Sequence, residues 1–197
     1  FFQFTEACRG ISEACVAFGT PVTGGNVSFY NESPTGAVDP TPTVGMVGLL
    51  RRAEDRVPSH FRATGDRIVV VGATTGMLGG SAYWAELCHF VGGTPPKVDL
   101  DHETRLQQFL VAAAAARLLR SAHDCSEGGL AVALAEAAIG GPYAERGFGA
   151  VVDLQTYAPA LTATQVLYGE DHGRVVLTVA PSALPGLKAM LTRHGLQ

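Results

Sequence analysis

The segment Gly24–Glu32 (GGNVSFYNE) contains side chains that could hold a phosphate group and a metal ion. Its two glycines allow the backbone to approach a ligand closely. Asn26 and Ser28 are two positions apart, so in an extended segment their amide and hydroxyl groups point to the same side. Glu32 adds a carboxylate that could serve as a hard oxygen ligand or as a base. The competing interpretation is a simple turn at the entrance to a strand, because Gly-Gly-Asn is first of all a turn sequence.

A second cluster runs from His123 to Glu136 (HDCSEGGLAVALAE) and passes from polar residues through two glycines into a helical pattern. Such an arrangement presents free backbone N–H groups at the start of a helix, where anions bind. The alternative is a tight turn in which Asp124 or Ser126 caps the helix. His123 and Asp124 are adjacent, so in an extended segment they point to opposite sides and do not form a catalytic pair.

A third polar cluster, Gly169–Arg174 (GEDHGR), precedes an apolar run that is typical of a buried strand. Glu170 and Asp171 could hold a cation or a ribose hydroxyl, and His172 could move a proton. The alternative is a charged loop in contact with water.

Several common catalytic patterns are absent from the sequence. It contains no Gly-x-Ser-x-Gly motif, and Ser81 and Ser126 have no neighbouring base, which argues against nucleophilic hydrolysis. It contains neither a Walker A motif nor a Gly-x-Gly-x-x-Gly motif, so a nucleotide site would be of another kind. The formal net charge is −4 and the 14 Lys and Arg residues are scattered, which argues against a nucleic-acid partner.

The four cysteines form no CxxC pair and have no histidine at metal-ligand spacing; they are Cys8, Cys15, Cys88 and Cys125. We expect buried free thiols in a reducing cytoplasm rather than a zinc site or disulfides. No apolar run reaches the roughly 18 residues of a membrane span, and no signal-peptide pattern is present. The sequence therefore predicts a soluble, cytoplasmic protein without a membrane partner.

With 47% hydrophobic residues, the 197-residue chain can bury a core. The first part predicts a helix over about residues 2–18 that ends at Gly19, a short strand leading into Gly24–Tyr30, a loop over Asn31–Pro42 and a buried strand over Thr43–Leu50. A helical apolar stripe begins within the first turn, so we expect the chain to be a piece of something longer. The polar segment Arg51–Asp66 predicts a domain boundary near residue 60, giving domains 1–60 and 61–197.

Strands and helices are expected to alternate in the second domain. The predicted strands are Arg67–Ala73, Gly149–Leu154 and Arg174–Ala180, and the predicted helices are Gly79–Val91, Glu103–Ser121, Ser126–Ile139 and Ser182–His194. This alternation predicts an α/β or α+β fold, in which helices and a sheet form layers.

Five segments together resemble one family: TPVTGGNVSFYNE, PTPTVGMVGLL, LGGSAYWAEL, SAHDCSEGGLAVALAEAA and GEDHGRVVLT. They are similar, in this order and over essentially the whole chain, to the later part of the synthetase subunit of phosphoribosylformylglycinamidine synthase, also called formylglycinamide ribonucleotide amidotransferase, in its small form. That subunit has two similar halves, each with a substrate and nucleotide domain and an α/β companion domain. The resemblance implies the C-terminal half without its beginning: a partial first domain of the aminoimidazole-ribonucleotide-synthetase-like superfamily, followed by its α/β companion domain.

The resemblance implies an ATP-dependent ligase of de novo purine biosynthesis. In that reaction ATP activates the formyl amide oxygen of formylglycinamide ribonucleotide as a phosphate, and ammonia from glutamine then replaces this oxygen to give formylglycinamidine ribonucleotide. Mg²⁺ would neutralise and align the transferred phosphoryl group. The implied partners are the ribonucleotide, a glutaminase subunit and a small bridging subunit.

The resemblance also implies roles for three residues of the first segment. Gly25 would contact ATP through its backbone, Asn26 would coordinate Mg²⁺ through its side-chain oxygen, and Ser28 would bind the ribonucleotide. In the first half of the family's subunit, a Glu-Ser-Gln substrate motif stands where this chain has Glu170–His172. This departure implies that the pocket of the second half is auxiliary or structural.

The family's first half, which carries its catalytic histidines and main metal carboxylates, has no counterpart in this chain, so the isolated chain is expected to be inactive. Two other interpretations stay open. One is a non-catalytic module that holds nucleotide or supports assembly, and the other is a related ATP-using synthetase, such as aminoimidazole ribonucleotide synthetase or a selenophosphate synthetase. Related folds pair sheets between subunits, and Val44–Leu50 would leave a free strand edge, which predicts a homodimer of the chain.

Overall fold

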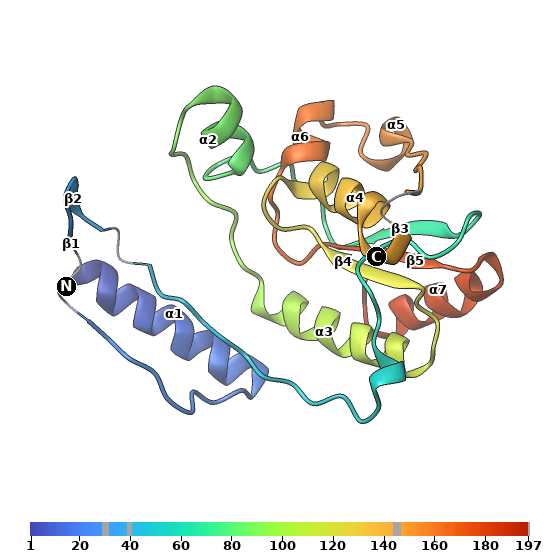
Figure 1. The fold of residues 1–197 in the computed structure, drawn as a ribbon, viewed down its shortest axis with the longest axis horizontal. Coiled ribbons are helices and arrows are strands. Elements are labelled where there is room, and N and C mark those ends of the chain that lie inside the picture. Colours follow the sequence, from blue (N-terminus) through green and yellow to red (C-terminus); the bar gives the residue numbers. More distant parts are fainter. Residues whose placement is uncertain (29–31, 39–40, 144–146, 197) are drawn as a thin grey trace. The chain divides into compact units, whose positions relative to one another are not determined.

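The chain divides into two compact units, Phe1–Leu49 and Leu50–Gln197. The structure is a computed structural model that describes residues 1–28, 32–38, 41–143 and 147–196, and Figure 1 shows its helices and strands. The domain limits expected from the sequence, 1–60 and 61–197, stay a prediction.

The first unit contains one long helix, α1 (Phe2–Phe18). The helix ends where Gly19 adopts a left-handed conformation with a φ of 62°, and the backbone N–H groups of Gly19 and Thr20 donate to carbonyls of the last turn. Glycine suits this position because it has no Cβ to clash with the backbone. The predicted helix and its predicted end are both confirmed.

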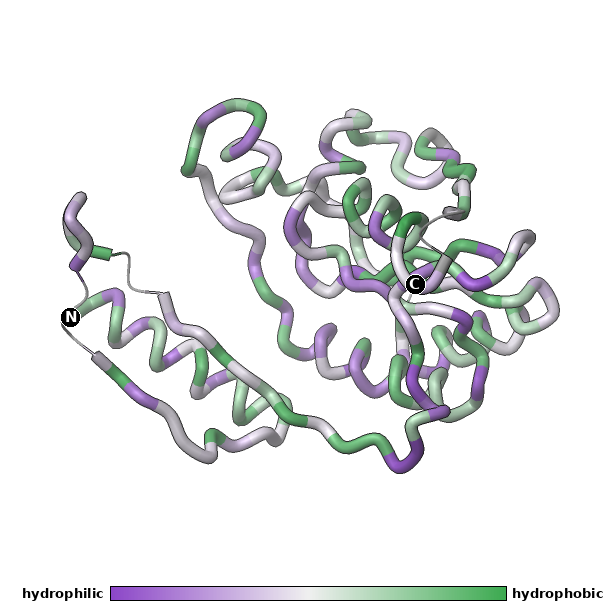
Figure 2. Tube along the Cα trace, in the orientation of Figure 1, coloured by the Kyte–Doolittle hydropathy of each residue, from purple (hydrophilic) through white to green (hydrophobic). Residues whose placement is uncertain are grey.

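The two strands predicted for the first unit do not form among its described residues. Residues 20–28 and 41–50 have no strand, while Phe29 and Tyr30, at the end of the segment into which the first predicted strand leads, lie outside the described residues. Instead, β1 (Glu32–Ser33) and β2 (Gly36–Ala37) form a short antiparallel hairpin inside the segment predicted as a loop. Residues 43–50 (TVGMVGLL) are mostly apolar (Figure 2). A strand is defined by hydrogen bonds to a neighbour, however, and no described segment pairs with these residues.

A three-stranded antiparallel sheet organises the second unit. It consists of β3 (Arg67–Val71), β4 (Ser121–Asp124) and β5 (Val175–Val179), in the spatial order β3-β5-β4. The central strand β5 pairs with both neighbours, and all five of its residues are buried, in keeping with its largely apolar sequence, VVLTV. The strands predicted to start near Arg67 and Arg174 are confirmed, whereas the sequence does not predict β4.

Helices cover both faces of this sheet (Figure 1). The covering helices are α3 (Leu100–Ala115), α4 (Gly129–Ile139), α6 (Ala163–Tyr168) and α7 (Leu184–Arg193). Val71 and Leu177 belong to the core cluster that includes α3 and α7, whereas Val176 packs against α4 and α6. Neighbouring residues of a strand point to opposite faces, so β5 contributes to both clusters. The layered mixture of helices and strands is confirmed, and the antiparallel pairing corresponds to the α+β alternative.

Two helices of the second unit are shorter than the sequence predicts. α2 (Ala82–Cys88) begins after the N-cap Ser81, as expected, but ends before Val91 because His89 adopts a left-handed φ of 53°. α3 ends at Ala115 instead of Ser121, and Arg117 beyond its end also has a positive φ, of 55°. A left-handed residue cannot continue a right-handed helix. The two helices predicted from Ser126 and Ser182 also begin slightly later, as α4 and α7.

The predicted strand Gly149–Leu154 is wrong. Residues 149–153 form no regular element, Leu154 opens the short helix α5 (Leu154–Tyr157), and Val151 is 99% exposed. The sequence analysis also omits α6, although its signal is present: Thr162 and Gln165 form a reciprocal capping box. The described part of the unit also contains short 3₁₀ turns at Ala53–Asp55, Gly141–Tyr143 and Pro181–Ala183.

Candidate functional site

The segment around Gly25 is exposed in the first unit. The Asn26 amide nitrogen donates a hydrogen bond to the Ser28 hydroxyl, with 3.4 Å between the two atoms. The two side chains therefore lie on one side of the segment, as their spacing predicts. A Cβ added at Gly25 would meet no atom of the described residues within 4 Å, so internal packing does not require glycine here and the backbone is open to a ligand. Glu32 lies in β1 with its side chain exposed.

In the second unit, Glu170 joins the starts of two helices. Its Oε1 accepts hydrogen bonds from the backbone N–H of Ala82, the first residue of α2, and from that of Gly128, just before α4, both at 2.8 Å. Helix starts carry unpaired N–H groups and a partial positive charge, so a carboxylate stabilises them. The Glu170 carboxylate thus binds the protein's own backbone. The sequence alone suggests instead a ligand for a cation or a ribose hydroxyl.

Asp171 is buried, with 5% of its surface exposed. Its carboxylate accepts hydrogen bonds from the backbone N–H groups of Thr75 (3.0 Å), Gly76 (3.0 Å) and Met77 (3.4 Å), and from the Thr75 hydroxyl. Burial acts to raise the pKa of Asp171, but these hydrogen bonds and the charge of Arg174 outweigh burial, so the pKa lies below its ordinary value. A solvated loop is therefore the wrong interpretation for Asp171, whereas His172 beside it is exposed.

The side chain of Arg174 is fully buried beneath the loop that follows β3. Its Nη2 donates to the Gly169 carbonyl, and its Nη1 donates to the Thr74 hydroxyl at 3.2 Å. Its Nε lies 4.0 Å from Oδ2 of Asp171 and has no hydrogen-bond partner within the described part of the chain. The cluster therefore contains a buried pair of opposite charges, of which the carboxylate is fully hydrogen-bonded and the guanidinium is not.

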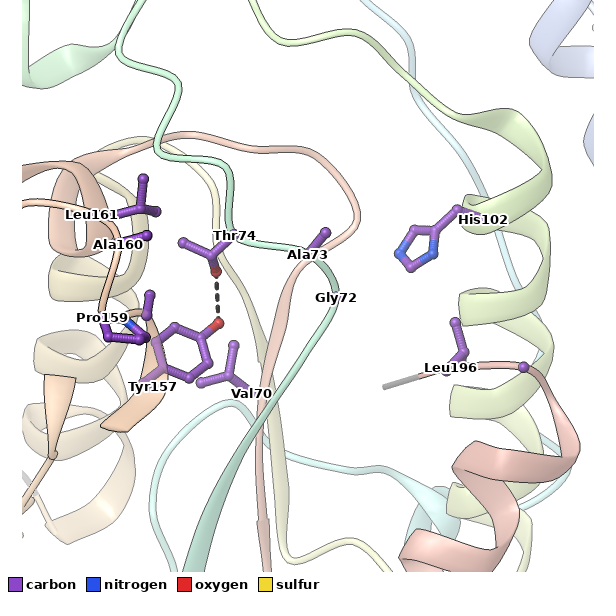
Figure 3. Close-up of a pocket in the computed structure, with 12 residues that line it drawn as sticks. Val70, Gly72, Ala73, Thr74, His102, Tyr157, Pro159, Ala160, Leu161 and Leu196 are labelled. Atoms are coloured by element: carbon purple, nitrogen blue, oxygen red, sulfur yellow. Dashed lines mark hydrogen bonds between the residues drawn. The ribbon is translucent and has the colours of Figure 1, made fainter. Parts of the chain in front are cut away.

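A cavity of about 690 Å³ lies beside the end of β3 (Figure 3). The hydroxyls of Thr74 and Tyr157 meet on one side of it at 2.6 Å, and His102 at the start of α3 lies on the other side. The Nε2 of His102 is 3.1 Å from the carbonyl oxygen of Gly173, close enough to donate a hydrogen bond to it. Sequence reasoning missed Thr74 and Tyr157 because no local pattern links residues so far apart.

The cluster at His123 lies on β4 and the turn that precedes α4. The N-cap of α4 is Gly128, which has a φ of 77°, and no side chain forms a capping hydrogen bond there. The predicted caps Asp124 and Ser126 are therefore wrong. The Ser126 hydroxyl donates instead to the Asp124 carboxylate, and Nε2 of His123 lies 3.2 Å from Oε2 of Glu136. The Gly128 N–H at the helix start, expected to be free for an anion, already binds the protein's own carboxylate.

All four cysteines are free, as predicted. Cys8 and Cys88 are exposed, so the expected burial is wrong for both, because neither α1 nor α2, which carry them, has a buried residue. Cys125 is largely buried, and burial raises the pKa of its thiol to about 11.

Across the described ranges, no group of three or more His, Cys, Asp or Glu side chains could hold a metal ion. None of the helices described here is long and apolar enough to cross a membrane.

Comparisons with known proteins identify relatives over nearly the whole chain. The phosphoribosylformylglycinamidine synthase subunit PurL of Thermobifida fusca is 47% identical over 197 residues, which cover 99% of this chain and 24% of the relative. The subunit of the same name from Moorella thermoacetica is 48% identical over 182 residues, which cover 92% of this chain and 24% of the relative. The chain thus spans about a quarter of the length of the curated relatives it matches. The resemblance drawn from the five motifs is confirmed.

Solved structures show the same fold. The structure described as T. maritima PurL complexed with FGAR has a TM-score of 0.57 at 19% identity, covering 74% of this chain and 25% of that chain. The structure of PurLQS from Thermotoga maritima has a TM-score of 0.51 at 18% identity, covering 74% and 23%. Family models for the AIR synthase related protein match twice, with its N-terminal domain over residues 2–50 and its C-terminal domain over residues 63–197. The chain belongs to the AIR synthase related protein family.

Proposed function

We propose that this chain forms part of an ATP-dependent ligase that converts formylglycinamide ribonucleotide, ATP and glutamine-derived ammonia to formylglycinamidine ribonucleotide. The observation that carries the proposal is the 47% identity to a phosphoribosylformylglycinamidine synthase subunit over 99% of this chain. The chain spans 24% of that relative, and we propose that the remaining parts of the site lie in sequence outside it. We therefore expect the isolated 197 residues to be inactive.

Three residues of the first unit would contribute to that active site. Gly25 would contact ATP through its backbone, Asn26 would coordinate Mg²⁺, and Ser28 would bind the ribonucleotide. The open space around Gly25 and the shared side of Asn26 and Ser28 support these roles. In the second unit, by contrast, the acidic pair Glu170 and Asp171 is already engaged by backbone N–H groups.

The donor set at Asn26 fits a magnesium ion that is only partly held by protein. The hydrogen bond to Ser28 uses the amide nitrogen of Asn26, which leaves its oxygen as the atom suited to a hard cation. Mg²⁺ usually keeps several waters and takes phosphate oxygens, so one amide oxygen is a suitable share of its ligands. When bound, the ion would neutralise charge on the transferred phosphoryl group.

The working assembly would include further subunits. We propose a glutaminase subunit, which supplies ammonia, and a small bridging subunit, with the complex located in the cytoplasm. The chain itself is proposed to dimerise through the exposed apolar segment Val44–Leu50, in which Val47 is 102% and Leu49 is 95% exposed. Light scattering at high concentration should give the mass of a dimer. The mass of a monomer would contradict this proposal.

The test of the metal role is Asn26→Ala, made both in this chain and in the full-length subunit. Calorimetric titration of the chain with Mg·ATP should give binding that the variant lacks, and turnover of the full-length variant should fall on the order of a hundredfold. Asn26→Asp is the matched control, since it keeps an oxygen ligand and should retain more activity. Normal turnover in the full-length Asn26→Ala protein would contradict the proposed role.

A second candidate function is a non-catalytic module that supports assembly or holds nucleotide. The exposed apolar residues Val44, Met46, Val47 and Leu49 favour it, because such a surface is suited to cover by another chain. Under this alternative, Asn26→Ala leaves turnover near normal, whereas a charged substitution such as Val47→Glu reduces assembly. The two variants therefore separate the candidates in the same full-length protein.

A further inference from the structure

The loop between β3 and α2 directs three consecutive backbone N–H groups to one point. The loop reads GATTGMLGGS over residues 72–81, and its glycines at 72 and 76 have φ values of 107° and 73°. Thr75, Gly76 and Met77 donate their N–H groups to a single carboxylate, and the Thr75 hydroxyl adds a fourth donor. Successive N–H groups that converge in this way form a nest, which binds anions in many proteins.

The anion in this nest is the side chain of Asp171, which comes from a distant part of the sequence. The N–H of Gly76 and the carboxylate that it binds are separated by 95 positions, and Asp171 is 5% exposed. The buried guanidinium of Arg174 lies behind the carboxylate, with Nε 4.0 Å from Oδ2 and without a hydrogen bond from that nitrogen to any described residue. Four donors and one buried cation are the components of an oxyanion site.

We propose that Thr75–Met77 form an oxyanion-binding nest that the chain fills with its own Asp171 carboxylate, and that a small free carboxylate takes this position once the aspartate is shortened. The nest is preorganised by the glycine conformations of the loop. Its formation does not require that the anion be covalently attached at position 171. This inference goes beyond the proposed ligase function, because it concerns a second anion site in the other unit. It can fail or hold regardless of what Gly25 and Asn26 bind.

The proposal has a functional consequence for the ligands of this chain. A glycine-rich loop between a strand and a helix is a common place for a phosphate group. Here the tethered carboxylate occupies that place at an effective concentration that a free anion does not match. The Thr75–Met77 nest is therefore closed to phosphate groups in the native chain.

The first test restores a missing carboxylate with a free one. Asp171→Ala in the 197-residue chain removes the carboxylate and leaves space for formate, whereas acetate carries one methyl group too many. We expect the Tm of Asp171→Ala to rise with formate by about 2 °C or more and to saturate, with little effect of acetate or of chloride at equal ionic strength. Asp153→Ala is the matched control, because Asp153 accepts hydrogen bonds from Thr156 at an exposed site.

Either of two results would overturn the proposal. One is a folded Asp171→Ala protein whose Tm does not respond to formate, and the other is an equal response in Asp153→Ala. Asp171→Asn adds a further check, since it fills the same volume without a charge and should not respond to formate.

The second test uses the native chain, so it can show whether the nest is formed even if Asp171→Ala does not fold. Hydrogen exchange should show the amides of Thr75 and Gly76 to be protected at least about tenfold more than the exposed amide of Gly25. The protection should fall in Asp171→Asn, which offers one acceptor oxygen in place of two. Exchange of the native loop amides at the rate of Gly25 would show that the nest is not formed.

Discussion

The hydroxyl groups of Thr74 and Tyr157 lie 2.6 Å apart, although 83 positions separate the two residues in the sequence. Thr74 also accepts a hydrogen bond from the buried guanidinium of Arg174. The contact therefore connects the loop after β3, the end of α5 and the residue that immediately precedes β5. One wall of the cavity in Figure 3 depends on this chain of hydrogen bonds.

Removing the Tyr157 hydroxyl should weaken this wall without creating a large void. We expect Tyr157→Phe to lower the free energy of unfolding by about 1 kcal/mol, because Thr74 loses one hydrogen bond and retains the other. Urea unfolding measures the change. The control is Tyr168→Phe, which removes a hydroxyl from a ring that packs against Tyr83 and should cost less. Equal losses in the two variants would argue against a specific role for the Thr74 contact.

Arg174 should be far less tolerant of substitution than an exposed arginine. Arg174→Met removes two hydrogen bonds and leaves the buried Asp171 without its neighbouring cation, so the free energy of unfolding should fall by about 3–5 kcal/mol. Arg67→Met at the exposed start of β3 should change it by no more than about 0.5 kcal/mol. Thermal and urea unfolding of both variants would test the difference, and a mild effect of Arg174→Met would contradict it.

Glu170 should stabilise the unit through its carboxylate oxygen and not through its charge alone. Glu170→Ala leaves the N–H groups of Ala82 and Gly128 without an acceptor, which should cost about 2–4 kcal/mol of unfolding free energy. Glu170→Gln retains a carbonyl oxygen and should lose less. Glu86→Ala on the exposed side of α2 serves as control. If the glutamine variant is as unstable as the alanine variant, charge and not hydrogen bonding dominates.

Asp171 should make stability depend on pH at acid values. Its pKa is lower in the folded chain than in the unfolded chain, so its contribution is present above the ordinary carboxyl pKa of about 4 and is lost as the pH falls through the folded value. The difference in unfolding free energy between the native chain and Asp171→Asn should therefore shrink as the pH is lowered below about 4. Urea unfolding at a series of pH values measures it, and a constant difference would contradict the assignment.

Cys125 should be the slowest cysteine to react with a thiol reagent. Burial raises the pKa of its thiol to about 11, so little thiolate is present near neutral pH, whereas Cys8 and Cys88 are exposed. Peptide mapping after brief treatment with iodoacetamide should find Cys8 and Cys88 modified well before Cys125. Labelling of Cys125 at the same rate would show that its surroundings open readily in solution.

The sequence predicts the elements whose signal is local. The prediction fails for elements that form only by pairing with a distant part of the chain. α1 and β5 follow from periodicity, an apolar run and a glycine stop, and all three are local features. β4 reads Ser-Ala-His-Asp and has no apolar run; it is a strand because Ala122 pairs with Leu177. Conversely, residues 43–50 and 149–154 have the apolar composition of strands but no partner among the described residues.

The same distinction applies to the candidate sites. The contact between Asn26 and Ser28 spans two positions, so alternation along an extended segment predicts it. The link between Asp171 and Thr75 spans 96 positions, and nothing near either residue indicates the other. The polar cluster Gly169–Arg174 was visible in the sequence, but its use as an internal support for backbone N–H groups became visible only from the contacts.

The central position of β5 also determines the order in which the second unit can fold. More than a hundred positions separate Val71 of β3 from its partner Val175, and among the described strands β4 pairs with β5 alone. A ribosome must therefore release nearly the whole unit before any of its sheet can pair, and the closure of such long loops slows folding. Until β5 emerges, the apolar strand β3 remains open to other chains, so the yield of folded protein should depend on chaperones and on the rate of synthesis.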